Sequence, residues 1–321
     1  MMNESVSLMP ASQRASGATK SGLSAKKSSD EVTVPEKNER FAPIPVALLP
    51  DSNLSSPAPH ARPTVQPPPQ GHCRPYPSPG RRRHDRTLIE GRRALQAALD
   101  AGAPIVEAVV TPDALDAPAV QSLLDRLSGP VFEADPDTVA QITDVATPQG
   151  LVAVAERRLH TPDTMPERLG DTGTALLLDG VQDPGNVGTL LRTAAWFGAQ
   201  AVVAGPGTAG LYGPKVMRAG AGSHWALDLA RADELGPLLD HFRRHDVSLY
   251  GADLQGVQAH AWRPTRPSAL ALGSEAHGLS AVVLDRLDAT VALRGAPNRP
   301  AAESLNVAVA GGILLYEWLG P

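Results

Sequence analysis

Short apolar runs alternate with helical periodicity from Leu88 onward. Apolar residues spaced three and four apart between Leu88 and Leu99 predict a helix, and Gly102 is placed to follow its C-cap. A second helix, at 120–127, is predicted to stop at Gly129. The pattern indicates a compact α/β module. Its other predicted elements are a strand at 105–110, a strand including 131–132, a helix at 138–142 and a strand at 151–155.

A second alternation with longer apolar runs begins at Ala175, after a polar stretch at 156–170 that contains Pro162 and Pro166. Apolar strands that alternate with helices are typical of a parallel sheet covered on both faces. The residues after Ser304 are apolar or small on nearly every helical face, so the last helix is predicted to be buried all round, against its own core, a partner subunit, or both. The predicted strands are 175–179, 201–204, 248–252, 269–272 and 289–293.

Composition sets residues 1–83 apart from the rest of the chain. They hold 14 of the 31 prolines and few aromatic residues, and we expect them to be disordered. The chain has no apolar run long enough to cross a bilayer and no secretory signal, so we expect a cytoplasmic protein without a membrane partner. The single cysteine, Cys73, excludes an intramolecular disulfide framework and a cysteine-rich zinc site, and we expect no metal.

The net charge of −5 is unevenly distributed along the chain. Residues 1–83 carry 11 Lys/Arg against 6 Asp/Glu, whereas the remainder carries 18 against 28. An acidic folded region counts against nucleic-acid binding, which usually requires a basic surface. Six arginines lie between Arg81 and Arg93 and are suited to bind phosphate, although a solvated linker is the commoner explanation of such a run.

The segment Gly205–Gly210 matches the G-x-G-x-x-G pattern of dinucleotide-binding loops and follows a predicted strand. That pattern should open a helix directly, but Gly213 and Pro214 delay the next helix here. We therefore favour a glycine-rich surface loop and keep a nicotinamide-dependent oxidoreductase as an alternative.

Polar residues follow the strand that ends at Asp179. A turn at 183–185 is predicted to deliver Asn186 as the N-cap of a helix. Arg192 then lies in that helix, from which its guanidinium can reach back over the strand ends, where open α/β sheets bind ligands. Taken alone, a helix cap and a surface arginine explain these two residues slightly better than a site.

Two further segments carry polar residues at the start of a loop or helix. The strand at 269–272 runs into Gly273, which permits close backbone approach to a ligand, and Glu275 can accept hydrogen bonds there. His277 is interpreted as a solvent-facing side chain. Ser304 and Asn306 open the C-terminal helix and either cap it or face a ligand.

Three motifs occur in order: D-x-x-x-D-P-x-N-x-G-x-x-x-R-T-A from Asp179, L-x-L-G-S-E-x-x-G-L-S from Leu270, and E-S-L-N-V-A-V-A from Glu303. Together they resemble the SpoU (TrmH-like) RNA 2′-O-ribose methyltransferase family of the SPOUT superfamily. Residues 86–158, with Leu88–Gly91 and Thr147–Val154, are similar to the family's substrate-binding domain. The expected organisation is a disordered tail at 1–83, a substrate-binding domain at 84–159, a linker at 160–171 and a methyltransferase domain at 172–321.

The resemblance implies an α/β fold in which a trefoil-knotted C-terminal methyltransferase domain follows a small α/β, ribosomal-protein-like RNA-binding domain. It implies a homodimer whose active site is completed across the interface, with S-adenosyl-L-methionine as cofactor. The region 291–300 is longer than the family pattern and carries two arginines. By motif, the catalytic residues are Asn186, Arg192, Glu275, Ser304 and Asn306, and the cofactor-binding residues are Leu272, Gly273, Leu293, Ser304 and Leu305.

The implied reaction is methyl transfer to a ribose 2′-hydroxyl of structured RNA. A separate substrate-binding domain favours large-subunit ribosomal RNA over transfer RNA, which remains an alternative, as does an RNA-binding paralogue without activity. An arginine stays charged in proteins. We therefore expect Arg192 to grip a phosphate and stabilise the developing alkoxide, while Asn186, Glu275 and Asn306 orient the reactants.

Overall fold

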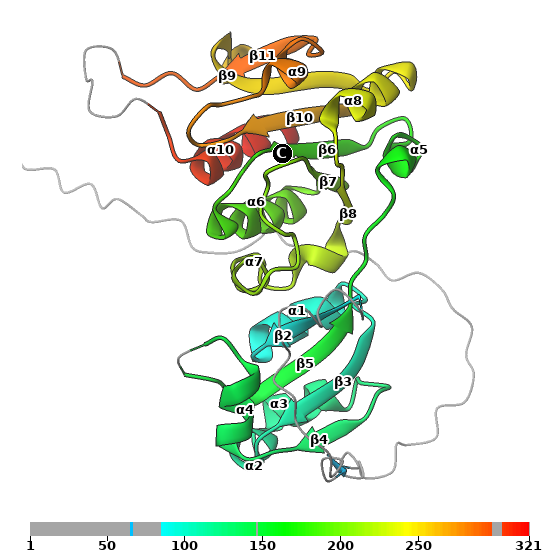
Figure 1. Ribbon diagram of the computed structural model, residues 1–321, viewed down its shortest axis with the longest axis vertical. Coiled ribbons are helices and arrows are strands. Elements are labelled where there is room, and N and C mark those ends of the chain that lie inside the picture. The colour runs from blue at the N-terminus through cyan, green and yellow to red at the C-terminus, as the bar shows by residue number, and fades with distance from the viewer. Residues whose placement is uncertain (1–64, 67–84, 146, 297–303, 321) are drawn as a thin grey trace, which may run out of the picture. The chain divides into compact units, whose positions relative to one another are not determined.

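The computed structural model describes residues 65–66, 85–145, 147–296 and 304–320. The chain divides into two units, 1–58, which lies outside these residues, and 59–321. The second unit contains two β-sheets (Figure 1). Within the described residues, no helix is long and apolar enough to cross a membrane.

The first sheet is mixed, with strand order β1-β4-β3-β5-β2. Strand β3 pairs in parallel with β4 and antiparallel with β5, and β5 pairs antiparallel with β2. Its strands are β1 (Val65–Gln66), β2 (Arg86–Glu90), β3 (Ile105–Val110), β4 (Val131–Glu133) and β5 (Leu151–Glu156). Its helices are α1 (Arg92–Asp100), α2 (Pro112–Leu115), α3 (Pro118–Leu124) and α4 (Pro136–Ile142).

Two predictions for this part of the chain were wrong. Leu88 lies in strand β2, where burial alternates along the strand, and the helix begins only at Arg92, after Gly91 turns the chain with φ 84°. Residues Val65–Gln66 pair in parallel with β4, although 1–83 was expected to be disordered throughout; the rest of that segment lies outside the described residues. Gly102, with φ 71°, follows the C-cap of α1 as predicted.

The second sheet has the order β11-β9-β10-β6-β7-β8, and every neighbouring pair is parallel, as the alternation of apolar strands and helices predicted. Its strands are β6 (Thr174–Asp179), β7 (Ala201–Ala204), β8 (Asp228–Arg231), β9 (Ser248–Gln258), β10 (Ser268–Gly273) and β11 (Ala289–Ala292). The helical elements are η1 (Pro162–Thr164), α5 (Met165–Leu169), α6 (Pro184–Phe197), α7 (Pro214–Gly220), η2 (Ser223–Ala226), α8 (Leu235–Arg244), η3 (Ala259–Ala261), α9 (Ala281–Leu284) and α10 (Val307–Leu319).

Strand β6 is buried along its whole length, so both faces of the sheet must be covered. Leu176 and Leu178 belong to the core under α6, α7 and α10, whereas Ala175 and Leu177 belong to the core under α5, α8 and α9. Successive strand residues point to opposite faces, so a run of apolar residues in one strand contributes to both cores. The polar ends of the central strands are therefore the positions open to a ligand.

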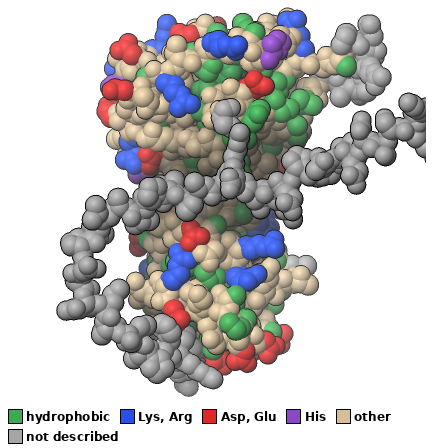
Figure 2. Space-filling view, turned by 180° about the vertical axis from the view of Figure 1, so that it is seen from behind, with side chains coloured by type: hydrophobic (Ala, Val, Ile, Leu, Met, Phe, Trp, Pro, Cys, Tyr) green, Lys and Arg blue, Asp and Glu red, His purple; other side chains and the backbone are tan. Residues whose placement is uncertain are grey.

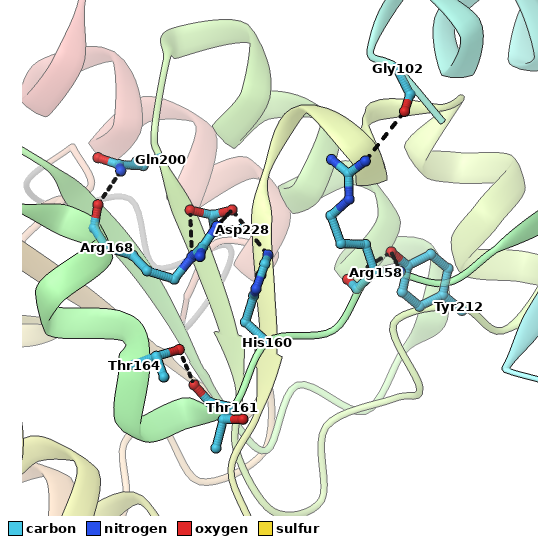
Figure 3. A network of polar contacts seen from close by, with 9 residues as sticks. All are labelled: Gly102, Arg158, His160, Thr161, Thr164, Arg168, Gln200, Tyr212 and Asp228. Atoms are coloured by element: carbon cyan, nitrogen blue, oxygen red, sulfur yellow. Dashed lines mark hydrogen bonds and ion pairs between the residues drawn. The ribbon is translucent and has the colours of Figure 1, made fainter. Parts of the chain in front are cut away.

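The polar stretch interpreted as a linker is partly folded. Met165 and Leu169 of α5 are buried against the sheet, so α5 belongs to the second core. Arg168 of α5 donates two hydrogen bonds to Asp228 at the start of β8, over 3.0 and 2.7 Å, and His160 Nε2 lies 3.2 Å from the same carboxylate (Figure 3). This segment is thus tied to the sheet by side chains that the sequence pattern classed only as polar.

Helix α10 is not buried all round within this chain. Ala308, Leu314 and Leu315 face the core, but the side chains of Val309, Ile313 and Tyr316 are exposed. Gly311 lets the helix approach α6 and β10, because a Cβ atom there would lie 2.4 Å from Leu190 Cδ2. The helix therefore has one buried face and one apolar face left uncovered.

Candidate functional site

Helix α6 begins after strand β6 and carries the first predicted site residue. Its N-cap is Asp183, whose Oδ1 accepts a hydrogen bond from the backbone N–H of Asn186 at 2.9 Å. The prediction that Asn186 caps the helix was therefore wrong by three residues. Pro184 occupies the first helical turn, a position where a missing N–H costs nothing. Because Asp183 caps the helix, the Asn186 amide is free to bind other groups.

Three predicted residues meet at the carboxyl ends of the strands. Asn186 Nδ2 donates to Glu275 Oε1 at 2.7 Å, and Asn306 Nδ2 donates to Asn186 Oδ1 at 3.1 Å. Asn306 is also the N-cap of α10, since its Oδ1 accepts from the backbone N–H groups of Ala308 and Val309. One residue from each motif thus joins a continuous hydrogen-bonded chain, although 120 positions separate Asn186 from Asn306.

The loop that carries Glu275 is held in a closed turn. Ser274 and Gly278 exchange two backbone hydrogen bonds of 2.9 Å. A Cβ atom on Gly273 would lie 2.1 Å from the Gly278 carbonyl carbon, so glycine is needed for the chain to fold back on itself. The sequence predicts close approach of a ligand to this glycine, whereas the group that approaches it in the structure is the loop's own backbone.

Asp179 is a residue of the site that was not predicted from the sequence. Its buried carboxylate accepts a hydrogen bond of 2.6 Å from the backbone N–H of Ser280, which ties the end of β6 to the loop of Glu275. The available signal was a carboxylate at the end of a wholly apolar strand, because a buried acid needs a partner. Asp179 therefore positions the second motif against the first.

The glycine-rich segment Gly205–Gly210 packs beside this site. Thr208 is buried; its hydroxyl donates to the Leu178 carbonyl at 2.8 Å and accepts from the Gly180 N–H at 3.2 Å. No helix opens from the segment, since α7 starts only at Pro214. The glycine-rich segment therefore supports the turn after β6, and it lacks the strand–loop–helix geometry that a dinucleotide-binding loop requires.

Arg192 and Ser304 are predicted catalytic residues that do not belong to the hydrogen-bonded chain that joins the three motifs. Arg192 lies six residues after Asn186, which places it about 9 Å further along α6 and on a different face. Its exposed side chain lines an open hollow of about 480 Å³ with Thr189, Thr193, Trp196 and Ala219. Within the described residues its guanidinium forms no hydrogen bond or ion pair, so it is available for an external group.

The predicted cofactor residues surround the same strand ends. Leu272 is buried at the end of β10, whereas Leu293, just after β11, is partly buried. Ser304 and Leu305 precede α10 and are exposed, and Leu305 keeps half of its surface open beside Asn306. Residues 297–303 lie outside the described residues, and they include the last four residues of the stretch at 291–300 that departs from the family pattern.

Comparison with known proteins gives matches over both sheets. Residues 173–316 match the model described as the SpoU rRNA Methylase family, and residues 88–159 match RNA 2′-O ribose methyltransferase substrate binding. The chain is 35% identical over 235 residues to a 23S rRNA (guanosine(2553)-2′-O)-methyltransferase, RlmP, of Bacillus subtilis, over 73% of this chain and 88% of the relative.

Two solved structures share the arrangement. An AdoMet-bound rRNA methyltransferase from Sinorhizobium meliloti superposes with a TM-score of 0.66 at 28% identity, over 75% of this chain and 89% of the other. The SpoU methyltransferase AviRb from Streptomyces viridochromogenes, in complex with the cofactor AdoMet, gives a TM-score of 0.66 at 27% identity, over 76% and 92%.

Proposed function

Since the chain belongs to the SpoU family of RNA methylases, we propose that it transfers the methyl group of S-adenosyl-L-methionine to a ribose 2′-hydroxyl of large-subunit ribosomal RNA. The observation that carries this proposal is the hydrogen-bonded chain Glu275–Asn186–Asn306. It joins all three motifs at the carboxyl ends of β6 and β10. Ligands of open α/β sheets bind at this edge.

The strand ends suit the proposed cofactor. S-adenosylmethionine supplies an electrophilic methyl group and carries an apolar-faced adenine. Leu305 is half-exposed between two polar residues, and a flat base would cover it. The ends of β10 and β11, at Leu272–Gly273 and Leu293, would contribute backbone groups for hydrogen bonds. We therefore assign cofactor binding to Leu272, Gly273, Leu293, Ser304 and Leu305.

The hydrogen-bonded chain Glu275–Asn186–Asn306 orients a carboxylate oxygen that can accept a hydrogen bond from the ribose. A 2′-hydroxyl is a weak nucleophile, and in-line attack depends on its position. Asn186 holds one oxygen of Glu275 at 2.7 Å. The second oxygen of that carboxylate forms no hydrogen bond with the described part of the chain. It is therefore free to accept a hydrogen bond from the 2′-hydroxyl of the ribose. Asn306 in turn fixes the orientation of the Asn186 amide.

Arg192 is assigned to the phosphate beside the target ribose. Its planar fork pairs bidentately with phosphate, and a lysine would keep the charge but lose that geometry. Arg192→Lys should reduce kcat by at least tenfold. Arg286→Lys is the matched control, because the Arg286 guanidinium donates to Asp240 on α8 at 2.9 Å and has no role in the proposed site. Near-full activity of Arg192→Lys would refute this role.

We also propose a homodimer formed through α6 and α10. Trp196 is 84% exposed, and Val309, Ile313 and Tyr316 extend the apolar surface along α10. In Figure 2, hydrophobic side chains are visible on the surface of the part of the molecule that contains the second sheet. Clustered exposed apolar residues are typical of interaction sites. Trp196 is one turn beyond Arg192, so a partner docked here would also enclose the hollow beside Arg192 and complete the site.

The dimer is tested by light scattering after gel filtration. We expect wild-type dimers, and monomers with little activity for Ile313→Glu. Val282→Glu changes a similarly exposed apolar residue on α9 and should remain dimeric and active. A wild-type monomer with full activity, or an Ile313→Glu dimer, would contradict the arrangement.

The trefoil knot and the division of labour between the sheets are also proposals. Strand β11 lies at one edge of the second sheet, yet the chain must return from it to Asn306, which bonds to Asn186 near the start of α6. We propose that this return threads the family's trefoil knot. For the substrate-binding domain expected at 84–159, we propose RNA binding, supported by the exposed Arg92 and Arg93 at the start of α1.

Methyl transfer to RNA from a strain that lacks this gene tests the function. Purified protein is incubated with tritium-labelled S-adenosylmethionine and with separated ribosomal and transfer RNA. We expect label in large-subunit ribosomal RNA. Label confined to transfer RNA would overturn the substrate. Absence of label together with binding of NADH would overturn the enzyme class.

A further inference from the structure

We propose that Glu167, His241 and His245 form a binding site for a divalent transition metal, with Zn²⁺ as the ion that suits the ligands. The sequence predicts no metal site, and 74 positions separate Glu167 from His241 in it. The fold brings the three side chains together on α5 and at the end of α8, and one nitrogen or oxygen from each lies within 4.8 Å of the others.

The distances fit a tetrahedral ion closely. Ligand atoms at about 2.1 Å from a tetrahedral zinc lie about 3.4 Å apart. His245 Nε2 is 3.3 Å from Glu167 Oε1, and His241 Nε2 is 3.9 Å from the same oxygen. Small side-chain rotations therefore suffice. Two imidazoles and a carboxylate leave the fourth position to water, an arrangement that zinc accepts.

The ring of His245 is already set for coordination. Its Nδ1 donates to the carbonyl of His241 at 3.0 Å, which leaves the Nε2 lone pair free on the side of Glu167. Metal-bound histidines commonly donate their second ring N–H to a backbone carbonyl in this way. His241 Nε2 is 2.9 Å from the carbonyl of Asp163, a contact it would give up to coordinate through that nitrogen.

The backbones that carry the ligands are fixed before any ion binds. Arg168, the residue after Glu167, is held by Asp228 through two hydrogen bonds, and Gln200 Nε2 donates to its carbonyl (Figure 3). Phe242, next to His241, is fully buried. The two histidines are four residues apart in the sequence, near the end of α8, and the centroids of their rings are 4.4 Å apart. The backbone that carries the three ligands would therefore need little further ordering when an ion binds.

The cluster is separate from the proposed methyltransferase site. Helices α5 and α8 lead into the first residues of β6 and β9, whereas Asn186 and Glu275 follow the last residues of β6 and β10. The strands are parallel, so the metal cluster lies at the amino ends of the strands and the methyltransferase site at their carboxyl ends. An ion bound here would link α5 to α8. Helix α5 follows the segment that joins the two sheets.

Calorimetric titration of the tag-free, full-length protein with ZnCl₂ tests the site. We expect one ion per chain, at least tenfold weaker binding for His245→Ala and for Glu167→Gln, and a zinc-induced rise in Tm that both variants lose. His260→Ala removes an exposed histidine outside the cluster and should bind as the wild type does. Wild-type affinity in both variants, or no zinc binding by the wild type, would overturn the proposal.

Discussion

His224 is a buried histidine whose protonation should weaken the fold. It lies in η2 against Tyr212 and Trp225, with no exposed surface. Its Nε2–H donates to the Leu211 carbonyl at 2.9 Å, and its Nδ1 has no hydrogen-bond partner in the described part of the chain. Burial penalises the charged ring and lowers the pKa of His224 to about 4.

The size of the effect follows from that pKa. An unfolded histidine has a pKa of about 6.5, so between pH 6.5 and 4 the unfolded chain binds a proton that the folded chain does not. The stabilisation is complete above pH 6.5 and is lost as the pH falls towards 4. A difference of 2.5 pKa units corresponds to about 3 kcal/mol of unfolding free energy, on the scale of 1.36 kcal/mol per unit.

Urea unfolding at pH 7 and pH 4 measures this loss. We expect the unfolding free energy of the wild type to fall by about 3 kcal/mol more than that of His224→Gln, which keeps an amide donor but cannot be protonated. His260→Gln, at an exposed position, should lose as much as the wild type. An equal fall in the wild type and His224→Gln would refute the argument that burial keeps this ring neutral.

Three contacts in and near the site can be tested by substitution. Thr208→Val removes both hydrogen bonds of a buried hydroxyl and should cost about 1–3 kcal/mol by urea unfolding; an unchanged midpoint would show that these bonds do not support the turn after β6. Gly188→Val should lose about 2 kcal/mol or more, because its Cβ would lie 2.5 Å from Ala219 Cβ, whereas Gly210→Ala meets nothing within 4 Å and should be neutral; equal stability of the two would disprove close α6–α7 packing. Asn186→Asp sets two carboxylates against each other in place of a 2.7 Å hydrogen bond, so methyl transfer should fall at least tenfold at unchanged Tm, and wild-type turnover would remove this contact from the mechanism.

Much of the second sheet could be predicted because its strands are apolar along their whole length. The predicted strand at 201–204 coincides with β7, and the strand at 269–272 lies within β10. Strand β8 was missed, because its four residues, Asp228–Arg231, begin and end with a charge. Strand β9 extends to Gln258, well beyond the predicted end at 252, because its later residues lie at a partly exposed, irregular pairing with β11.

The site was predictable by residue type and motif order but not by geometry. Asn186, Glu275 and Asn306 were expected in one catalytic site. The structure shows that they are hydrogen-bonded to one another, and their catalytic role stays a prediction. That Asp183 caps α6 depends on which of two neighbouring side chains reaches the free N–H groups, a local competition that spacing does not decide. Burial of α10 on every side was predicted from its residue types, but residue types do not say whether the same chain or a partner covers a face. Within this chain the face of α10 with Val309, Ile313 and Tyr316 is exposed.

The proposed transfer to a ribose 2′-hydroxyl is tested by locating the transferred methyl group in the RNA. Methylation of a ribose 2′-oxygen blocks alkaline cleavage of the adjacent phosphodiester, because that cleavage requires a free 2′-hydroxyl. After reaction with tritium-labelled S-adenosylmethionine and ribosomal RNA, followed by complete alkaline hydrolysis, the account predicts that the label is recovered in alkali-resistant dinucleotides. Label recovered in mononucleotides would place the methyl group on a base and contradict the account.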